Sequence, residues 1–272
     1  MSCLNLDCHT ARNSGFGRKW QRPLSLLAAA LLASHSHSIA QTPESAGSKN
    51  EPDEVKQAMQ VPEGDARVQA LRAALLAWEQ KEPVAMIEWL CAAPKGSPQS
   101  GVLREASMDW GDRDHMAAIA WALKHDLKQP CPESIVFHLA IGQWARKDGK
   151  AAAEWADKQP KGNIRTIAYF SVAGGWASST ATEAAAAWAA KVPDADDRHA
   201  ALGRVAQAYS FKASAEAAAW AEKLPADDVK VIAGIIAGNW GRKDAAKAVQ
   251  WVNSLQLSPA EKDDILNRAK LK

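Results

Sequence analysis

A pattern that recurs six times along the chain constrains its fold more than any other feature. Its clearest copy is the stretch 144–160, WARKDGKAAAEWADKQP, in which a Trp is followed by an Asp, an alanine run, a second Trp and a Pro. The leading aromatic residues are spaced 32, 34, 32, 33 and 31 residues apart, and a partner Trp follows each after 11 residues, or 12 in the fourth copy. The six pairs are Trp78 and Trp89, Trp110 and Trp121, Trp144 and Trp155, Trp176 and Trp188, Tyr209 and Trp220, and Trp240 and Trp251. A period of this length is typical of helical-repeat proteins.

Each copy is predicted to be a helical hairpin. Apolar residues precede the leading aromatic by three, four and seven positions, as Phe137, Ala140 and Ile141 do before Trp144, and this spacing defines one face of a helix. The bend is expected four residues after the aromatic, at Glu82, Asp114, Asp148, Thr180, Ala213 and Asp244. Asp and Thr there would cap the second helix. Thr180 and Glu183 would form a capping box, and Ser214 would replace Ala213 as the cap.

The remaining segments complete a single all-α domain. Asp65 is expected to cap the first helix of the repeat region, with order beginning near Pro62, and a charged helix over 259–271 is expected to cover the last hairpin. The predicted fold is a right-handed α/α superhelical solenoid of about six hairpins with a C-terminal cap helix, over residues 62–272. Gly142, Gly174 and Gly238, each two residues before a leading Trp, are expected to make room for an indole of a neighbouring helix.

Residues 1–40 have the pattern of a secretory signal peptide. A basic stretch, a short apolar run over 24–32 and small residues ending at Ala40 follow in that order. Polar residues rich in Pro and Gly follow, and we expect a disordered linker over 41–61. The protein is therefore expected to be secreted or periplasmic, with no integral membrane segment after cleavage.

Removal of residues 1–40 changes the charge and the cysteine content. The formal charge falls from +2 to about −1, since four of 33 basic residues and one of 31 acidic residues are lost. No basic stripe remains for nucleic acid. Cys91 and Cys131 are left, in a compartment where disulfides form. Two buried thiols and a Cys91–Cys131 disulfide, allowed by four extra residues before Pro130, both remain open.

The repeat resembles bacterial α/α-hairpin repeats of the tetratricopeptide, Sel1-like and HEAT type, from Asp65 to Lys272. The order of aromatic, turn, alanine, aromatic and Pro carries this resemblance, although the second aromatic comes early and the period is about two residues short. The resemblance implies a superhelical scaffold that binds a partner, and it brings no catalytic residue.

No motif for chemistry stands out in the chain. His115, His125, His138 and His199 lie in separate repeats, so no metal site is predicted, and no cofactor or catalytic residue is predicted. The cluster over 109–115, DWGDRDH, is interpreted as a hairpin turn rather than a cation site. We expect a non-catalytic scaffold that binds a protein or peptide partner. The alternatives are an α-hairpin enzyme acting on cell-wall or other polysaccharide, or an accessory domain of a cell-wall machine.

Overall fold

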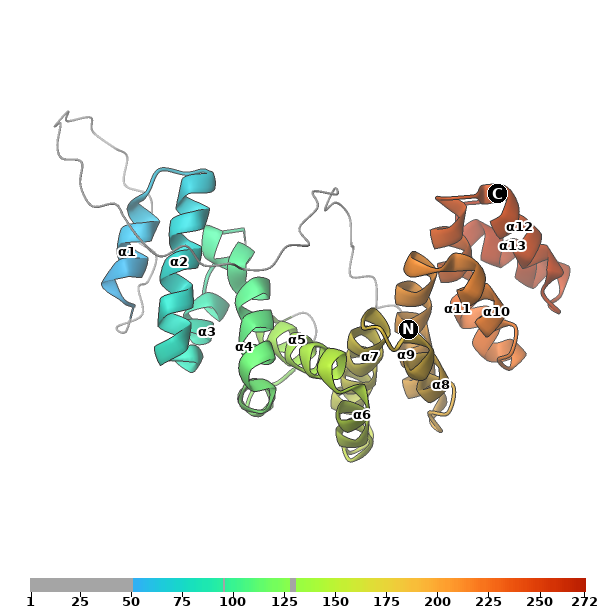
Figure 1. Ribbon diagram of the computed structural model, residues 1–272, viewed down its shortest axis with the longest axis horizontal. Coiled ribbons are helices and arrows are strands. Elements are labelled where there is room, and N and C mark those ends of the chain that lie inside the picture. Colours follow the sequence, from blue (N-terminus) through green and yellow to red (C-terminus); the bar gives the residue numbers. More distant parts are fainter. Residues whose placement is uncertain (1–50, 95, 128–130) are drawn as a thin grey trace. The chain divides into compact units, whose positions relative to one another are not determined.

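The structure, a computed structural model, describes residues 51–94, 96–127 and 131–272, and these residues form thirteen helices and no strand (Figure 1). The predicted signal peptide, 1–40, and the first part of the predicted linker lie outside the described residues. Among the described helices, none is long and apolar enough to cross a membrane.

The helices alternate between a longer and a shorter member, as the repeat predicts. The first helices of the hairpins are α2 (Asp65–Lys81), the first part of α4 (Pro98–Ala122), α5 (Pro132–Lys147), α7 (Asn163–Ser178), α9 (Ala195–Lys212) and α11 (Ala226–Gly241). The second helices are α3 (Pro83–Cys91), the last part of α4, α6 (Gly149–Asp157), α8 (Thr182–Ala189), α10 (Ser214–Ala221) and α12 (Ala245–Ser254). The element α4 contains both helices of the second hairpin. Its backbone leaves the helical conformation between them, at Asp114.

Packing between the helices follows their order in the sequence. The first helices form one layer in which α4 contacts α5, α5 contacts α7, α7 contacts α9 and α9 contacts α11. Each second helix lies against its own first helix and the next one, as α6 does with α5 and α7. This arrangement buries apolar side chains along the whole described chain, since each hairpin covers the apolar face of its neighbour. The all-α prediction is confirmed.

In five of the six hairpins, a residue at the predicted position directly precedes the second helix and has non-helical backbone angles. Glu82, Asp114, Asp148, Ala213 and Asp244 have φ of −141°, −145°, −141°, −144° and −156° and ψ of 67°, 76°, 83°, 86° and 90°. The Oδ1 atoms of the three Asp residues accept from N–H groups three residues later, at 2.9 to 3.1 Å. Because Ala213 adopts the same conformation without a polar side chain, hairpin packing sets the bend and the caps only stabilise it.

Three predicted caps are wrong. Asp65 is the first residue of α2, and Gly64, with φ of 137°, holds the cap position in a conformation that favours glycine. Thr180 and Glu183 form no capping box, because the extra residue of the fourth copy lengthens the bend and α8 begins only at Thr182. Ser214 is already inside α10, and its hydroxyl donates to the Ser210 carbonyl at 2.7 Å.

Two helices lie outside the six hairpins. The helix α1 (Asp53–Gln60) contacts α2 and buries Val55 and Ala58, so the predicted linker over 41–61 is wrong for this segment. The few apolar residues of α1 are enough to hold the helix in place, because they pack against α2. The cap helix is α13 (Pro259–Arg268), which ends three residues earlier than expected. Ser258 and Glu261 form a capping box there.

The three recurring glycines do not face indoles as predicted, and their neighbours are backbone atoms or a guanidinium group. A Cβ on Gly175 would overlap the backbone of Gly142, so α5 and α7 touch through these two residues. At Gly174 the neighbour is the Arg204 guanidinium, and at Gly238 it is backbone of the segment after α13. An indole does need a glycine at a different place, because a Cβ on Gly149 would overlap the ring of Trp176.

Candidate functional site

The six aromatic pairs all meet across their hairpins. Their ring centroids lie 5.8 to 6.3 Å apart, within the range of favourable aromatic contacts. Exposure is below one-tenth for Trp78, Trp89, Trp110, Trp121, Tyr209 and Trp251, and intermediate for the other six. Half of the rings are therefore buried within the hairpins, and the other half are partly exposed. Their contribution to stability stays a prediction.

Some indoles also link neighbouring hairpins. The Nε1 of Trp121 donates to Glu88 of α3 at 3.4 Å, and the Nε1 of Trp251 donates to Glu222, just after α10, at 3.1 Å. In both cases the carboxylate belongs to the preceding hairpin. These bonds satisfy the one polar atom of a buried indole and set the position of one hairpin against the next.

Cys91 and Cys131 are both free thiols in the structure. Burial raises the pKa of Cys91 to about 12, and the negative charge of Glu133 adds to the effect. Cys91 lies at the end of α3, and Cys131 lies just before α5. Cys131 also caps α5, since its Sγ accepts from the Ser134 N–H at 3.3 Å. The disulfide stays a prediction.

One serine and histidine pair has the spacing of a catalytic pair but not the required hydrogen bonds. His138 Nδ1 lies 2.7 Å from Ser171 Oγ, and the same Oγ lies 2.6 Å from the Ile167 carbonyl. A carbonyl only accepts, so the hydroxyl proton of Ser171 points to Ile167 and Nδ1–H of His138 must donate. An imidazole that donates to the hydroxyl cannot activate it as a base. This pair joins α5 to α7 and is not a nucleophile.

The other histidines also have structural neighbours. His115 stacks on Trp144 at 4.6 Å and His125 lies 4.7 Å from Trp121, while His199 contacts Asp228. In the part of the chain that the structure describes, no group of three or more His, Cys, Asp or Glu could hold a metal ion. The predicted turn at 109–115 is present, with Arg113 pairing at 2.8 Å with the buried Glu79 of the preceding hairpin.

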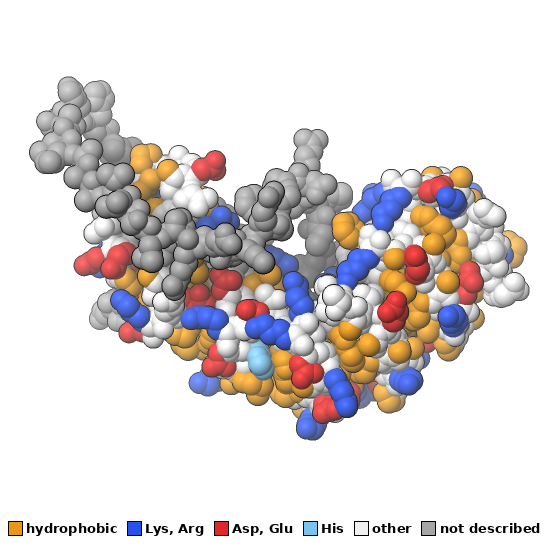
Figure 2. All heavy atoms as spheres, viewed as in Figure 1, with side chains coloured by type: hydrophobic (Ala, Val, Ile, Leu, Met, Phe, Trp, Pro, Cys, Tyr) orange, Lys and Arg blue, Asp and Glu red, His pale blue; other side chains and the backbone are white. Residues whose placement is uncertain are grey.

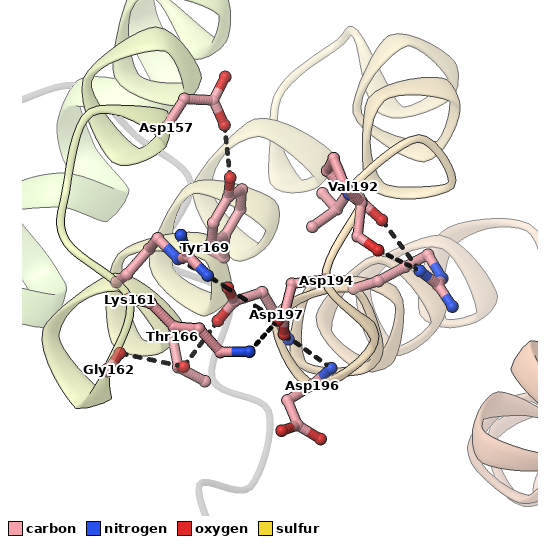
Figure 3. A network of polar contacts seen from close by, with 12 residues as sticks. Asp157, Lys161, Gly162, Thr166, Tyr169, Val192, Asp194, Asp196 and Asp197 are labelled. Atoms are coloured by element: carbon pink, nitrogen blue, oxygen red, sulfur yellow. Dashed lines mark hydrogen bonds and ion pairs between the residues drawn. The ribbon is translucent and has the colours of Figure 1, made fainter.

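A network of polar contacts, which we did not predict from the sequence, joins α7 to α9 (Figure 3). The Asp197 carboxylate is almost fully buried and accepts from Arg165 Nε at 2.8 Å and from Thr166 Oγ1 at 2.7 Å. At its edge, Lys161 pairs with Asp194 at 2.6 Å. The network thus fixes the start of α9 against the start of α7.

The same arrangement recurs between α9 and α11 and between α11 and the cap helix α13. Asp228 of α11 is also buried, and it accepts from Arg198 Nε at 3.1 and 3.2 Å and contacts His199 Nε2 at 3.1 Å. Lys230 then pairs with Glu261 of α13 at 2.8 Å. In each of these three contacts, an acidic residue at the third position of one helix pairs with a basic residue near the start of the first helix of the preceding hairpin. The sequence signal for this arrangement is an Asp or Glu about 30 residues after a base.

A hollow lies between the second helices of the first two hairpins. Its volume is about 530 Å³, and it is open to solvent. It is lined by Val84, Glu88, Ala117, Ala120, Trp121, Lys124 and His125. Val84 is 41% exposed, and Met116, one turn before Ala120, is 47% exposed. This second-helix pocket, as we name it, therefore has apolar walls and a charged rim.

On the face shown in Figure 2, basic and acidic side chains are interspersed with apolar ones. No single sign of charge dominates that view, which agrees with a formal charge of +2 for the whole chain. The second-helix pocket is thus the clearest candidate for a contact site, because exposed apolar residues around a hollow mark interaction surfaces.

Comparison of the chain with protein-family models, with curated proteins and with solved structures gives no match. The fold alone defines the class: an all-α protein of consecutive helical hairpins, each with an aromatic pair.

Proposed function

We propose that the protein is a secreted or periplasmic scaffold, not an enzyme, that binds a protein or peptide partner. In this proposal the hairpins continue as a right-handed α/α superhelical solenoid of the kind that tetratricopeptide-like repeats form. The second-helix pocket carries the proposal. Exposure of its apolar walls, and of Val84 and Met116, to water costs free energy. A partner side chain that filled the pocket would remove these apolar groups from solvent.

The chemistry of the described residues supports a binding role. His138 and Asp197 have the polar geometry closest to that of a catalytic site. Both side chains form hydrogen bonds that join neighbouring helices. A glycosidase would need two carboxylates facing one cleft. The second-helix pocket has a single carboxylate, Glu88, on its lining, and that group accepts from Trp121.

Site-specific photo-crosslinking tests the proposal. A photoreactive residue at Val84 or Met116 should capture the same partner from envelope extract, and it should do so at least several times more efficiently than one at Ile135. Ile135 is the matched control, because it is similarly exposed, at 38%, on a first helix. Val84→Glu should abolish capture from position 116, whereas Ile135→Glu should not. Equal capture from all three positions would contradict the pocket as the contact site.

Secretion has its own test. Expressed in a bacterium, the protein should be recovered from the periplasm or medium with an N-terminus at Gln41, as determined by intact mass. Recovery of the full-length chain from the cytoplasm alone would contradict the predicted leader.

A further inference from the structure

The layer of first helices carries a cluster of basic and aromatic side chains that the proposed function does not use. Arg104, His138 and Phe170 each lie six residues before the leading aromatic of their hairpins, and Arg204 lies five before its own. They belong to α4, α5, α7 and α9, which contact one another in that order. Three of these positions are equivalent on packed neighbours, and the Arg204 guanidinium lies over the Phe170 ring of α7, so the four side chains form one row. We call them the basic–aromatic row.

The guanidinium of Arg204 is held in a fixed position within this row. Its central carbon lies 4.6 Å from the centroid of the Phe170 ring, and Nη1 donates to Gln207 Oε1 at 2.5 Å. Gly174 leaves the space that the group occupies, because a Cβ there would come within 3.0 Å of Nη2. A planar guanidinium stacked on an aromatic ring loses little further freedom when it binds an anion.

The pKa of His138 depends on the charges around the row. Its ring lies 5.4 Å from Phe170, and burial lowers its pKa to about 4, with Arg204 and then Arg104 adding to the decrease. Both charges that act on this imidazole within the described chain are positive. The row therefore brings two guanidinium charges close to one buried imidazole.

Arg104 is the exposed end of the row. It makes no ion pair with any residue in the described ranges, in contrast to Arg72 of α2, which pairs with Glu105 at 2.9 Å. An exposed, unpaired Arg gains more from an incoming carboxylate than one already neutralised, because the bond is charge-assisted and bidentate.

We propose that the basic–aromatic row binds an acidic peptide segment, whose carboxylates pair with Arg104 and Arg204 across Phe170. Packed helices lie about 8–10 Å apart, so α4 and α9, three intervals apart, are separated by at most about 30 Å. An extended chain advances about 3.3 Å per residue, so a segment of eight or nine residues spans even the full distance. A chain with several carboxylates can thus pair with both guanidinium groups at once. This binding site is separate from the second-helix pocket and goes beyond the proposed function.

Fluorescence anisotropy with the full chain and a labelled octaglutamate peptide tests the proposal. Arg104→Gln should weaken binding about 5- to 10-fold, the loss expected for one charge-assisted pair. Arg146→Gln is the matched control, because it removes the same charge from an exposed position in the last turn of α5, and it should change the affinity less than twofold. Arg204→Lys keeps the charge but loses the planar stacking, and it should weaken binding at least threefold.

Several outcomes would overturn the proposal. Equal effects of Arg104→Gln and Arg146→Gln would show non-specific attraction to a charged peptide. Binding of octalysine as tight as that of octaglutamate would exclude charge recognition, and binding of tripolyphosphate without any binding of octaglutamate would exclude a peptide ligand. None of these results would bear on crosslinking at Val84 or Met116, so failure here and failure of the proposed function are distinguishable.

Discussion

Replacing Asp228 by Asn tests whether the buried carboxylates of Asp197 and Asp228 hold one hairpin against the next. The Asp228 side chain is 3% exposed and accepts from Arg198 and His199 of the preceding hairpin. An Asn of the same size has one acceptor oxygen and one donor group, so an N–H would face another donor. The loss of one charge-assisted hydrogen bond costs about 1.5–3 kcal/mol. The Arg198 side chain, 23% exposed, still donates to the Val192 and Pro193 carbonyls, so the cost should stay below the roughly 3–5 kcal/mol of a fully orphaned buried charge.

The neighbouring residue supplies the control. Asp227 is 88% exposed and pairs only with Lys230 in the described chain, so Asp227→Asn should cost no more than about 0.5 kcal/mol. Urea unfolding followed by circular dichroism at 222 nm measures both, and Asp228→Asn should lower the midpoint by about 1 M. Hydrogen exchange should increase mainly in α11–α13, because hairpins in such an array contact only their neighbours. Equal midpoints for the two variants would refute the reasoning.

The remaining predictions concern the bends, the close approaches and the buried rings. Ala213→Asp should stabilise the protein by about 0.5–1 kcal/mol, because the bend already has the conformation of the capped ones, and an unchanged or lower urea midpoint would count against this. Gly149→Ala should destabilise by about 1–3 kcal/mol through overlap with an indole, whereas Gly101→Ala, with open space around it, should not. The buried His138 keeps a pKa of about 4 in the folded state against 6.5 for the free side chain, so stability should be full above pH 6.5 and fall by about 3 kcal/mol as pH drops towards 4. His138→Gln should remove most of that pH dependence of the melting temperature. Trp110→Ala should cost about 3–5 kcal/mol, and native tryptophan emission should be blue-shifted and weakly quenched by iodide; red-shifted, readily quenched emission would indicate exposed rings.

The hairpins and their bends follow from the sequence, because both depend on residues close together in the chain. An aromatic residue, a bend four positions later and a second aromatic after 11 residues are local spacings, and a helical period converts them directly into facing rings. Asp148 illustrates this, since its capping partner lies only three residues away. The fourth hairpin departs from the rule for an equally local reason: its extra residue displaces the cap from Thr180.

The contacts between hairpins depend on the tertiary structure. Asp197 and Asp228 resemble ordinary helix-start acids in the sequence, and only packing shows that their partners lie about 30 residues earlier and that both carboxylates are buried. The prediction that the recurring glycines face indoles is wrong for the same reason. A glycine in a helix indicates that space is needed, but the sequence does not show which group fills it. The row from Arg104 to Arg204 exists only because four helices pack in sequence, a relation between residues a hundred positions apart. Local periodicity determined the repeating unit, and the packing of one unit on the next decided which polar groups are buried.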